Sequence, residues 1–182
     1  DIFYDFFREY FACFDIKPNR GHKILASWEH KGIIRHLVTQ NVDGLHQKAG
    51  SVNVLEVHGT VKTATCINRR CRAAYDMQEL LSHTGQFWKC RCGGGLIKPD
   101  AVLFDEPVPK IHEALRYATE ADAVLILGTS LQVYPVANIV HLSSQKPTII
   151  VNYSSTPFDH QPNTTVIYGG IGETLEKINE FL

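Results

Sequence analysis

The sequence lacks any marked excess of charge of one sign and any dense set of cysteines. Its 182 residues carry 18 Lys and Arg against 19 Asp and Glu, so the formal net charge is −1. This balance leaves no electrostatic footprint for nucleic acid, because nonspecific binding to phosphates depends on clustered basic side chains. Five cysteines are too sparse for a disulfide scaffold.

A long apolar run is missing as well. The longest segment without Asp, Glu, Lys or Arg, residues 123–145, still contains Pro135, Asn138 and His141, so we expect no membrane-spanning segment. What the sequence does have is an apolar share of 44%, which is enough for a core. The length fits one domain, or one domain that carries a small insertion.

Hydrophobic periodicity predicts strands that alternate with helices. We expect helices at residues 2–14, 19–31, 110–121, 135–144 and 173–182, and strands at residues 33–39, 54–57, 101–104, 123–127, 148–151 and 165–168. The first helix should bury an aromatic stripe, Asn19 should cap the second helix and Gly32 should end it. This alternation, with unbroken Val, Leu and Ile runs in the strands, predicts an α/β fold with a parallel sheet and helices on both faces.

Four of the five cysteines form two close pairs. Four residues separate Cys66 from Cys71, one residue separates Cys90 from Cys92, and eighteen lie between the pairs. Two short chain bends can each supply two ligands to a tetrahedral Zn²⁺, although these inner spacings depart from the usual two residues. The alternatives are four unrelated thiols or two disulfides. A closed four-thiolate site would be structural. Cys13 is expected to be a buried core thiol.

Polar clusters follow the predicted strands at residues 40–46, 58–59, 128–130 and 152–154. In doubly wound α/β folds, ligands bind beyond the carboxyl ends of the strands. Each cluster alone fits an ordinary turn, a helix cap or a structural histidine, but four of them in one chain favour a nucleotide site. The sequence contains no Gly-x-Gly-x-x-Gly fingerprint for a pyrophosphate.

These segments together resemble the sirtuin family, the silent-information-regulator deacylases. Residues 39–46 read Thr-Gln-Asn-Val-Asp-Gly-Leu-His, and residues 56–60 read Glu-Val-His-Gly-Thr, like the family's catalytic-histidine segment. The four cysteines coincide with its zinc module, residues 98–106 with its substrate-binding strand, and residues 128–135 and 151–152 with its later cofactor loops. Because the order and spacing agree over nearly the whole chain, the protein is identified as a member of this family.

The resemblance implies an NAD-dependent protein-lysine deacylase, by default a deacetylase. Its products would be nicotinamide, the deacylated lysine and O-acyl-ADP-ribose. The resemblance also implies a Rossmann-like sheet plus a small zinc-ribbon module, NAD as co-substrate and one structural Zn²⁺ per chain. The partner would be an acylated-lysine protein or peptide, with neither nucleic acid nor a membrane involved. The alternatives are an NAD-dependent protein ADP-ribosyltransferase, an inactive fragment that only binds peptides, and a zinc-ribbon nucleic-acid binder.

The resemblance also assigns roles to individual residues. His58 would be the general base for the ribose hydroxyls, a task that suits an imidazole with an ordinary pKa of about 6.5, and Asn41 would be the second catalytic residue. The implied NAD-binding residues are Gln40, Asn41, Asp43, Gly128, Thr129, Ser130, Asn152, Tyr153 and Ile171. Val102 and Phe104 match the acyl-lysine tunnel and the strand that pairs with substrate. The implied zinc ligands are Cys66, Cys71, Cys90 and Cys92.

The implied organisation has three parts. Residues 1–18 form a helical segment of the small domain, residues 19–60 and 98–182 form the Rossmann-like NAD-binding domain, and residues 61–97 form the zinc-binding module. Asp105 stands where the family usually has Gly, which could alter the local loop. The given sequence does not contain the family's opening segment, which carries a Gly-Ala-Gly turn and the central strand. We therefore expect the complete protein to begin upstream. Reduced thiols on zinc predict a cytoplasmic location.

Overall fold

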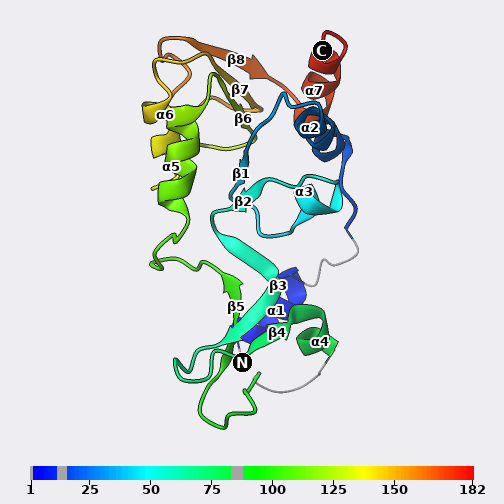
Figure 1. Ribbon diagram of the computed structural model, residues 1–182, viewed down its shortest axis with the longest axis vertical. Coiled ribbons are helices and arrows are strands. Elements are labelled where there is room, and N and C mark those ends of the chain that lie inside the picture. The colour runs from blue at the N-terminus through cyan, green and yellow to red at the C-terminus, as the bar shows by residue number, and fades with distance from the viewer. Residues whose placement is uncertain (1, 12–15, 83–87) are drawn as a thin grey trace.

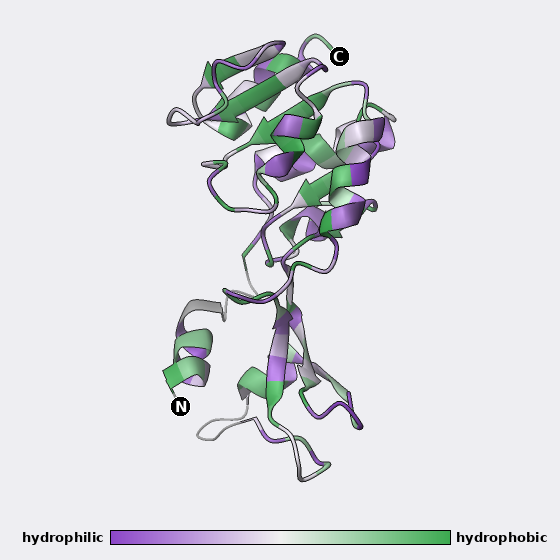
Figure 2. Cartoon of the chain, turned by 90° about the vertical axis from the view of Figure 1, so that its left-hand side faces the viewer, coloured by the Kyte–Doolittle hydropathy of each residue, from purple (hydrophilic) through white to green (hydrophobic). Residues whose placement is uncertain are grey.

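The computed structural model describes residues 2–11, 16–82 and 88–182, and the molecule has an upper and a lower part (Figure 1). Cys13 and the last residues of the predicted first helix lie outside the described residues. The upper part holds the parallel strands and most helices, and the lower part holds an antiparallel sheet. Figure 2 shows apolar residues concentrated on the strands of the upper part. None of the helices in the described part of the chain has the length and apolar character to span a bilayer.

The upper part contains two parallel sheets. Strand β1 (Leu37–Thr39) pairs with β2 (Val54–Glu56), while β6 (Val124–Leu127), β7 (Thr148–Asn152) and β8 (Thr164–Tyr168) form a second sheet in that order. The predicted parallel pairing is confirmed, but in the described residues the strands are divided between two sheets. The strand expected at residues 33–39 is shorter, because residues 33 and 34 still hydrogen-bond the carbonyl of Trp28 at the helix end.

Helices cover both sides of these sheets. Helices α2 (Arg20–His30) and α7 (Ile171–Asn179) pack together on one side, and α5 (Ile111–Glu120) and α6 (Asn138–Leu142) on the other (Figure 1). A short helix, α3 (Leu45–Lys48), follows β1. The helix expected at residues 135–144 is shorter than predicted, and the one expected at residues 173–182 begins two residues earlier, at Ile171.

The second helix shows how sequence signals fix one element. The Asn19 side chain accepts a hydrogen bond from the backbone N–H of His22 at 3.1 Å, and Gly32 adopts a φ of 74° just past the helix, as predicted. Trp28 is buried, and its indole N–H donates to Asn179 of α7 at 2.7 Å. Leu37 of β1 and Leu127 of β6 pack into the same apolar cluster as Trp28, so the α2–α7 pair joins the two sheets.

The lower part is an antiparallel sheet flanked by two helices. Its strands are β4 (Ala74–Asp76), β3 (Gly59–Cys66) and β5 (Ile97–Ala101), in that order, with α1 (Ile2–Phe11) and α4 (Met77–Ser82) beside them. The aromatic stripe of α1 is buried in part: Tyr4 and Phe7 pack on Trp88, with ring centroids 4.8 Å and 6.1 Å away. Phe6 is half exposed.

The strand predicted at residues 101–104 is wrong in its position. Strand β5 ends at Ala101, because its buried residues alternate at Ile97, Pro99 and Ala101 and face the core of the lower part. After Ala101 the chain turns away from β3, and Phe104 is 98% exposed. The apolar letters of residues 102–104 therefore belong to a loop.

The two parts meet where β2 leads into β3. Gly59 lies at this junction with a φ of 74°, and a Cβ built on it would stand 2.0 Å from the backbone oxygen of Asp100. No side chain fits this space, because such a distance is far inside van der Waals contact. The absence of a side chain at position 59 therefore lets β3 and β5 approach closely just after His58.

Replacing Gly59 tests this constraint. Gly59→Ala should lower the free energy of unfolding by more than about 2 kcal/mol, because it adds a backbone clash to a strained φ. Gly32→Ala is the matched control: Gly32 has the same φ of 74° but open space around it, so only the conformational cost of about 1 kcal/mol should appear. Urea denaturation measures both, and equal losses would contradict the close approach.

Candidate functional site

His58 is held between the polar loop after β1 and the loop after β5. Its ring Nδ1 lies 3.2 Å from the backbone oxygen of Gln40, and its own backbone oxygen accepts a hydrogen bond from the N–H of Val102 at 2.8 Å. Because a carbonyl can only accept, Nδ1 carries the proton in the neutral ring and Nε2 is left as the acceptor. The ring is half-buried. His58 can therefore take a proton from a group bound beside it.

Local hydrogen bonds from backbone N–H groups to nearby side chains hold the loop of residues 40–46 in place. The N–H of Asn41 donates to Thr39 Oγ1 at 3.1 Å, and the N–H of Leu45 donates to the Asp43 carboxylate at 2.9 Å. The second bond lets Asp43 fix the chain just before α3. Gln40 and Asp43 are half-buried and Asn41 is exposed. Of the three predicted residues on this loop, Gln40 contacts the His58 ring through its backbone oxygen, and Asn41 and Asp43 follow it on the same loop.

A second group of predicted residues gathers at the carboxyl ends of β6 and β7. The N–H of Gly128 donates to the Val151 oxygen at 2.9 Å, and a Cβ on Gly128 would stand 2.7 Å from the Ile171 side chain. The N–H of Gly169 donates to the Asn152 oxygen at 3.0 Å. Strand ends and the start of α7 therefore meet here, as expected for a ligand site in a parallel sheet.

The other predicted residues of this group lie on the same loops. Thr129 accepts a hydrogen bond from the N–H of Leu131 at 3.2 Å, and Ser130 is exposed. Tyr153 is 81% exposed, and its hydroxyl stands 3.0 Å from where a Cβ on Gly170 would lie. Exposed hydroxyls and amides around a bare glycine can bind ribose and phosphate groups.

The loop after β5 places the two predicted substrate residues differently. Val102 is half-buried, whereas Phe104 projects into solvent. Directly after Phe104, Asp105 adopts a φ of 68°, a conformation that glycine favours and that Asp tolerates. Position 105 therefore has a backbone conformation that a glycine would also adopt without strain. Glu106 closes the loop by accepting from the N–H of Leu103 and pairing with Lys98, both at 3.0 Å.

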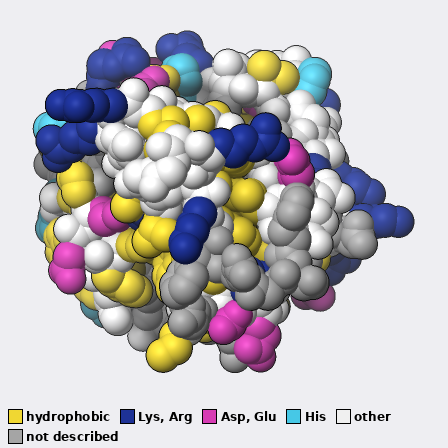
Figure 3. Space-filling model, turned by 90° about the horizontal axis from the view of Figure 1, so that it is seen from below, with side chains coloured by type: hydrophobic (Ala, Val, Ile, Leu, Met, Phe, Trp, Pro, Cys, Tyr) yellow, Lys and Arg dark blue, Asp and Glu magenta, His cyan; other side chains and the backbone are white. Residues whose placement is uncertain are grey.

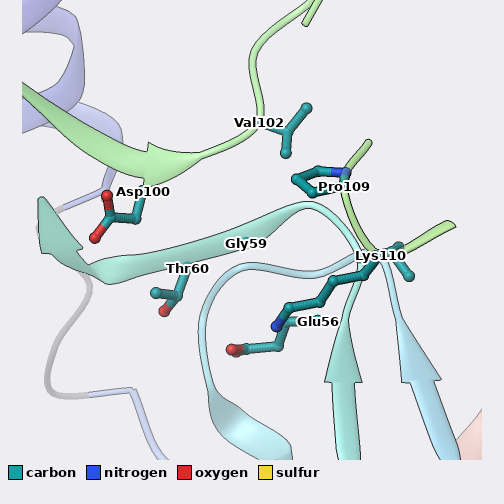
Figure 4. A pocket seen from close by; sticks show the side chains of 8 residues that line it. Glu56, Gly59, Thr60, Asp100, Val102, Pro109 and Lys110 are labelled. Carbon is teal, nitrogen blue, oxygen red and sulfur yellow. The ribbon is translucent and has the colours of Figure 1, made fainter. Parts of the chain in front are cut away.

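Val102 also lines a cavity of about 240 Å³ next to the junction (Figure 4). Val102 and Pro109 lie at one side of this cavity, and the side chains of Glu56, Thr60 and Lys110 lie at the other. One carboxylate oxygen of Glu56 is buried and has no hydrogen-bond partner among the described residues. The cavity is therefore polar at one end and apolar at the end near Val102.

The four cysteines of the lower part form one cluster. Their Sγ atoms lie within 4.8 Å of one another, with Cys66 and Cys92 3.8 Å apart and Cys71 and Cys90 3.6 Å apart. A tetrahedral Zn²⁺ with Zn–S bonds of about 2.3 Å requires sulfur atoms roughly 3.8 Å apart, so the cluster fits this ion. The four thiols are free rather than joined in disulfides, which removes that alternative.

Cys90 is the thiol best prepared to lose its proton. The N–H of Cys92 and the hydroxyl of Tyr75, at 3.5 Å and 3.0 Å from its sulfur, lower the pKa of Cys90 to about 6. Burial raises the pKa of Cys66 to about 12. Tyr75 was not predicted, because its only sequence signal is a hydroxyl-bearing side chain four residues after Cys71. Tyr75 would hold the Cys90 sulfur in place when the metal is bound.

A pair of histidines beneath the Asp43 loop was also overlooked. The rings of His22 on α2 and His46 on α3 lie 4.7 Å apart, and both Nδ1 atoms are buried without a hydrogen-bond partner among the described residues. Burial lowers the pKa of both, and His22 lowers that of His46 further, although the nearby Asp43 opposes these shifts. The pair is therefore neutral in the folded protein over a wider pH range than free histidine.

Comparison with known proteins now adds to this geometry. Residues 1–135 match the model of the Sir2 family. A protein from Clostridium tetani named NAD-dependent protein deacetylase is 39% identical over 95% of this chain and 72% of its own length. A protein of the same name from Sulfurisphaera tokodaii is 43% identical over 99% of this chain and 70% of its own length.

Solved structures of Sir2 proteins have the same fold as this chain. A structure described as Sir2 bound to acetylated peptide superposes with a TM-score of 0.91 at 33% identity, over 98% of this chain and 77% of that one. A structure described as a complex of Sir2, a p53 peptide and NAD⁺ also gives 0.91 at 33% identity, over 98% of this chain and 76% of that one.

Loss of the Tyr75 hydroxyl should weaken the metal centre. We expect Tyr75→Phe to release zinc to a chromogenic chelator about tenfold faster, because outer hydrogen bonds hold the ligand sulfur in place. Tyr117→Phe removes a hydroxyl that bonds Glu113 and should leave the release rate unchanged. Cys90→Ser should lose the metal and lower the melting temperature. Equal release rates for the two Tyr variants would show that Tyr75 does not support the cluster.

The His22–His46 pair predicts a loss of stability in weak acid. Because the folded-state pKa values are lowered, the unfolded chain takes up protons first as the pH falls through about 6.5, and the free energy of unfolding decreases below that pH. His46→Gln should therefore flatten the dependence of melting temperature on pH between pH 7 and 5.5. His112→Gln, at an exposed position, should leave the slope unchanged. A slope shared by all three proteins would exclude the pair as its source.

Proposed function

The chain belongs to the Sir2 family, and we propose that it acts as an NAD-dependent protein-lysine deacylase, by default a deacetylase. The observation that carries this proposal is the position of His58, whose ring is bound to the Gln40 loop and whose backbone is bound to Val102. A base must reach both a cofactor and a substrate if it is to couple the two. Relatives named NAD-dependent protein deacetylase, and Sir2 structures described with acetylated peptide or NAD⁺, support the same reaction.

When bound, NAD would supply the ribose carbon that accepts the acyl oxygen, with nicotinamide as the leaving group. Gln40, Asn41 and Asp43 hold the nicotinamide and its ribose, and His58 Nε2 accepts the proton of a ribose hydroxyl. The half-buried position of the His58 ring limits access of stray water. Asn41 acts with His58 by orienting the bound ribose.

The remaining predicted residues divide between the cofactor and the acyl-lysine. Val102 contacts the acyl chain from its place by the cavity, and Phe104 flanks the substrate backbone, where its exposure leaves it free to do so. The phosphates, adenosine ribose and adenine are held by the second group, which consists of Gly128, Thr129, Ser130, Asn152, Tyr153 and Ile171.

We also propose a role for each segment of the chain. Residues 61–97 act as a structural module, with Cys66, Cys71, Cys90 and Cys92 as thiolate ligands of one Zn²⁺, while residues 19–60 and 98–182 hold NAD and residues 1–18 belong to the small domain. The free state of these thiols supports a reducing compartment, and we place the protein in the cytoplasm.

Removing the imidazole of His58 tests the mechanism. With NAD and an acetyl-lysine peptide, His58→Ala should lose more than about a hundredfold in kcat, because a general base contributes that much, while its melting temperature stays close to that of the parent. His112→Ala, on the exposed side of α5, should retain full activity. Mass spectrometry of the peptide reads out loss of the acetyl group. Full activity of His58→Ala would refute the assigned base, and an ADP-ribose adduct in place of acetyl loss would indicate the transferase alternative.

A further inference from the structure

Basic residues are concentrated in the segment of residues 61–97, although the whole chain is nearly neutral. This segment has two acidic residues, Asp76 and Glu79, and six basic ones: Lys62, Arg69, Arg70, Arg72, Lys89 and Arg91. It therefore carries a formal charge of +4, and the rest of the chain carries −5. A Zn²⁺ with four thiolates would leave this segment at +2. Figure 3 views the molecule from this end, and Lys and Arg side chains project at several points.

Two of these arginines line an open cleft. The cleft has a volume of about 600 Å³ and lies along β3, β5 and the loop after β5. Its charged lining residues are Arg69, Arg72, Lys98, Asp100 and Glu106. The exposed side chain of Ile67, at the end of β3, adds an apolar surface beside the arginines.

The acidic residues of the cleft already have partners. Asp100 accepts a hydrogen bond from Thr63 at 2.6 Å, and Glu106 pairs with Lys98 at 3.0 Å. By contrast, Arg69 and Arg72 make no ion pair with any residue in the described ranges. The cleft therefore offers two uncommitted guanidinium groups, which suit carboxylates because their planar N–H donors match a carboxylate's two oxygens.

The cleft is continuous with the stretch that the proposed function assigns to substrate. Val102 lines both this cleft and the cavity near His58. Lys98 lies four positions before Val102, a span of about 13 Å in a strand. An extended peptide with its acyl-lysine at Val102 would cover that distance in about four residues. The arginines lie beyond Lys98, so they would face substrate side chains four to six positions from the acyl-lysine.

We propose that this cleft is a second binding site for the protein substrate, which recognises a pair of acidic side chains four to six residues from the acyl-lysine. This inference rests on the proposed function. A nucleic-acid backbone is the less suitable anion, because the remaining chain carries −5 and would repel a long polyanion. A short acidic peptide segment meets the local positive charge without that penalty.

The test compares two fluorescein-labelled acetyl-lysine peptides of equal length. One carries two Glu residues at the positions four and six from the acetyl-lysine, and the other carries Gln there. The zinc-loaded protein should bind the Glu peptide about three- to tenfold more tightly by fluorescence anisotropy at low salt, and kcat/KM should rise by a similar factor. Arg69→Gln/Arg72→Gln should abolish this preference and leave kcat/KM for the Gln peptide unchanged.

The matched control is Arg70→Gln/Arg91→Gln. It removes the same charge from exposed positions of the same segment that do not line the cleft, so the preference should survive. Equal affinity of the parent protein for both peptides would overturn the proposal, as would loss of the preference in the control pair. So would tight binding of a 20-nucleotide oligothymidine that Arg69→Gln/Arg72→Gln abolishes, with no peptide preference. If neither peptide is deacetylated but the anisotropy difference persists, the proposed function fails while the cleft remains an acidic-peptide site.

Discussion

The close approach of two backbones at Gly59 is the constraint on which the site depends. Only a residue without a side chain lets β3 run so near the Asp100 carbonyl, and this contact directly follows His58. The same junction carries the hydrogen bond from Val102 to the His58 carbonyl and the one between the His58 ring and Gln40. This junction therefore fixes His58, the loop of residues 40–46 and the loop after Ala101 relative to one another. The chemistry needs this alignment, because a proton acceptor is useful only within hydrogen-bond reach of its donor.

The two parts of the molecule are stabilised in different ways. In the upper part, the α2–α7 pair buries Trp28 and Leu175 against strands from both parallel sheets, so apolar packing joins those sheets. The lower part has a core that includes two of the four cysteines, Cys66 and Cys90. A metal held by these thiols would thus be part of that core and would tie the two cysteine-bearing loops to the antiparallel sheet.

Sequence patterns predicted best where local chemistry decides the structure. Asn19 caps the start of α2 and Gly32 follows its end, as expected. The unbroken apolar runs form the parallel strands β6 and β7. The cysteine spacing predicted a cluster that the structure assembles. The family resemblance supplied the site residues; among them, the structure places the Gln40 backbone against the His58 ring and Gly128 against the Ile171 side chain.

Predictions from the sequence were wrong or missing where contacts between residues distant in the chain determine the structure. An apolar run at residues 101–104 favoured a strand, but pairing with β3 selected the preceding residues and left Phe104 in solvent. Strands β3 and β4 went unassigned because their residues alternate in burial without long apolar runs. Tyr75 and His22 could not be found, because each acquires its role from a partner distant in the chain, Cys90 or His46. Asp105 differs from the family in residue type, yet its backbone adopts the conformation that glycine favours.

The proposed reaction couples lysine deacylation to the consumption of NAD. The most direct measurement counts two products in one reaction, nicotinamide and deacetylated peptide, with an isotope label in the acetyl group. We expect equal amounts of both, with the label recovered in an acetyl-ADP-ribose. Release of labelled free acetate without nicotinamide, or nicotinamide without deacetylated peptide, would contradict it.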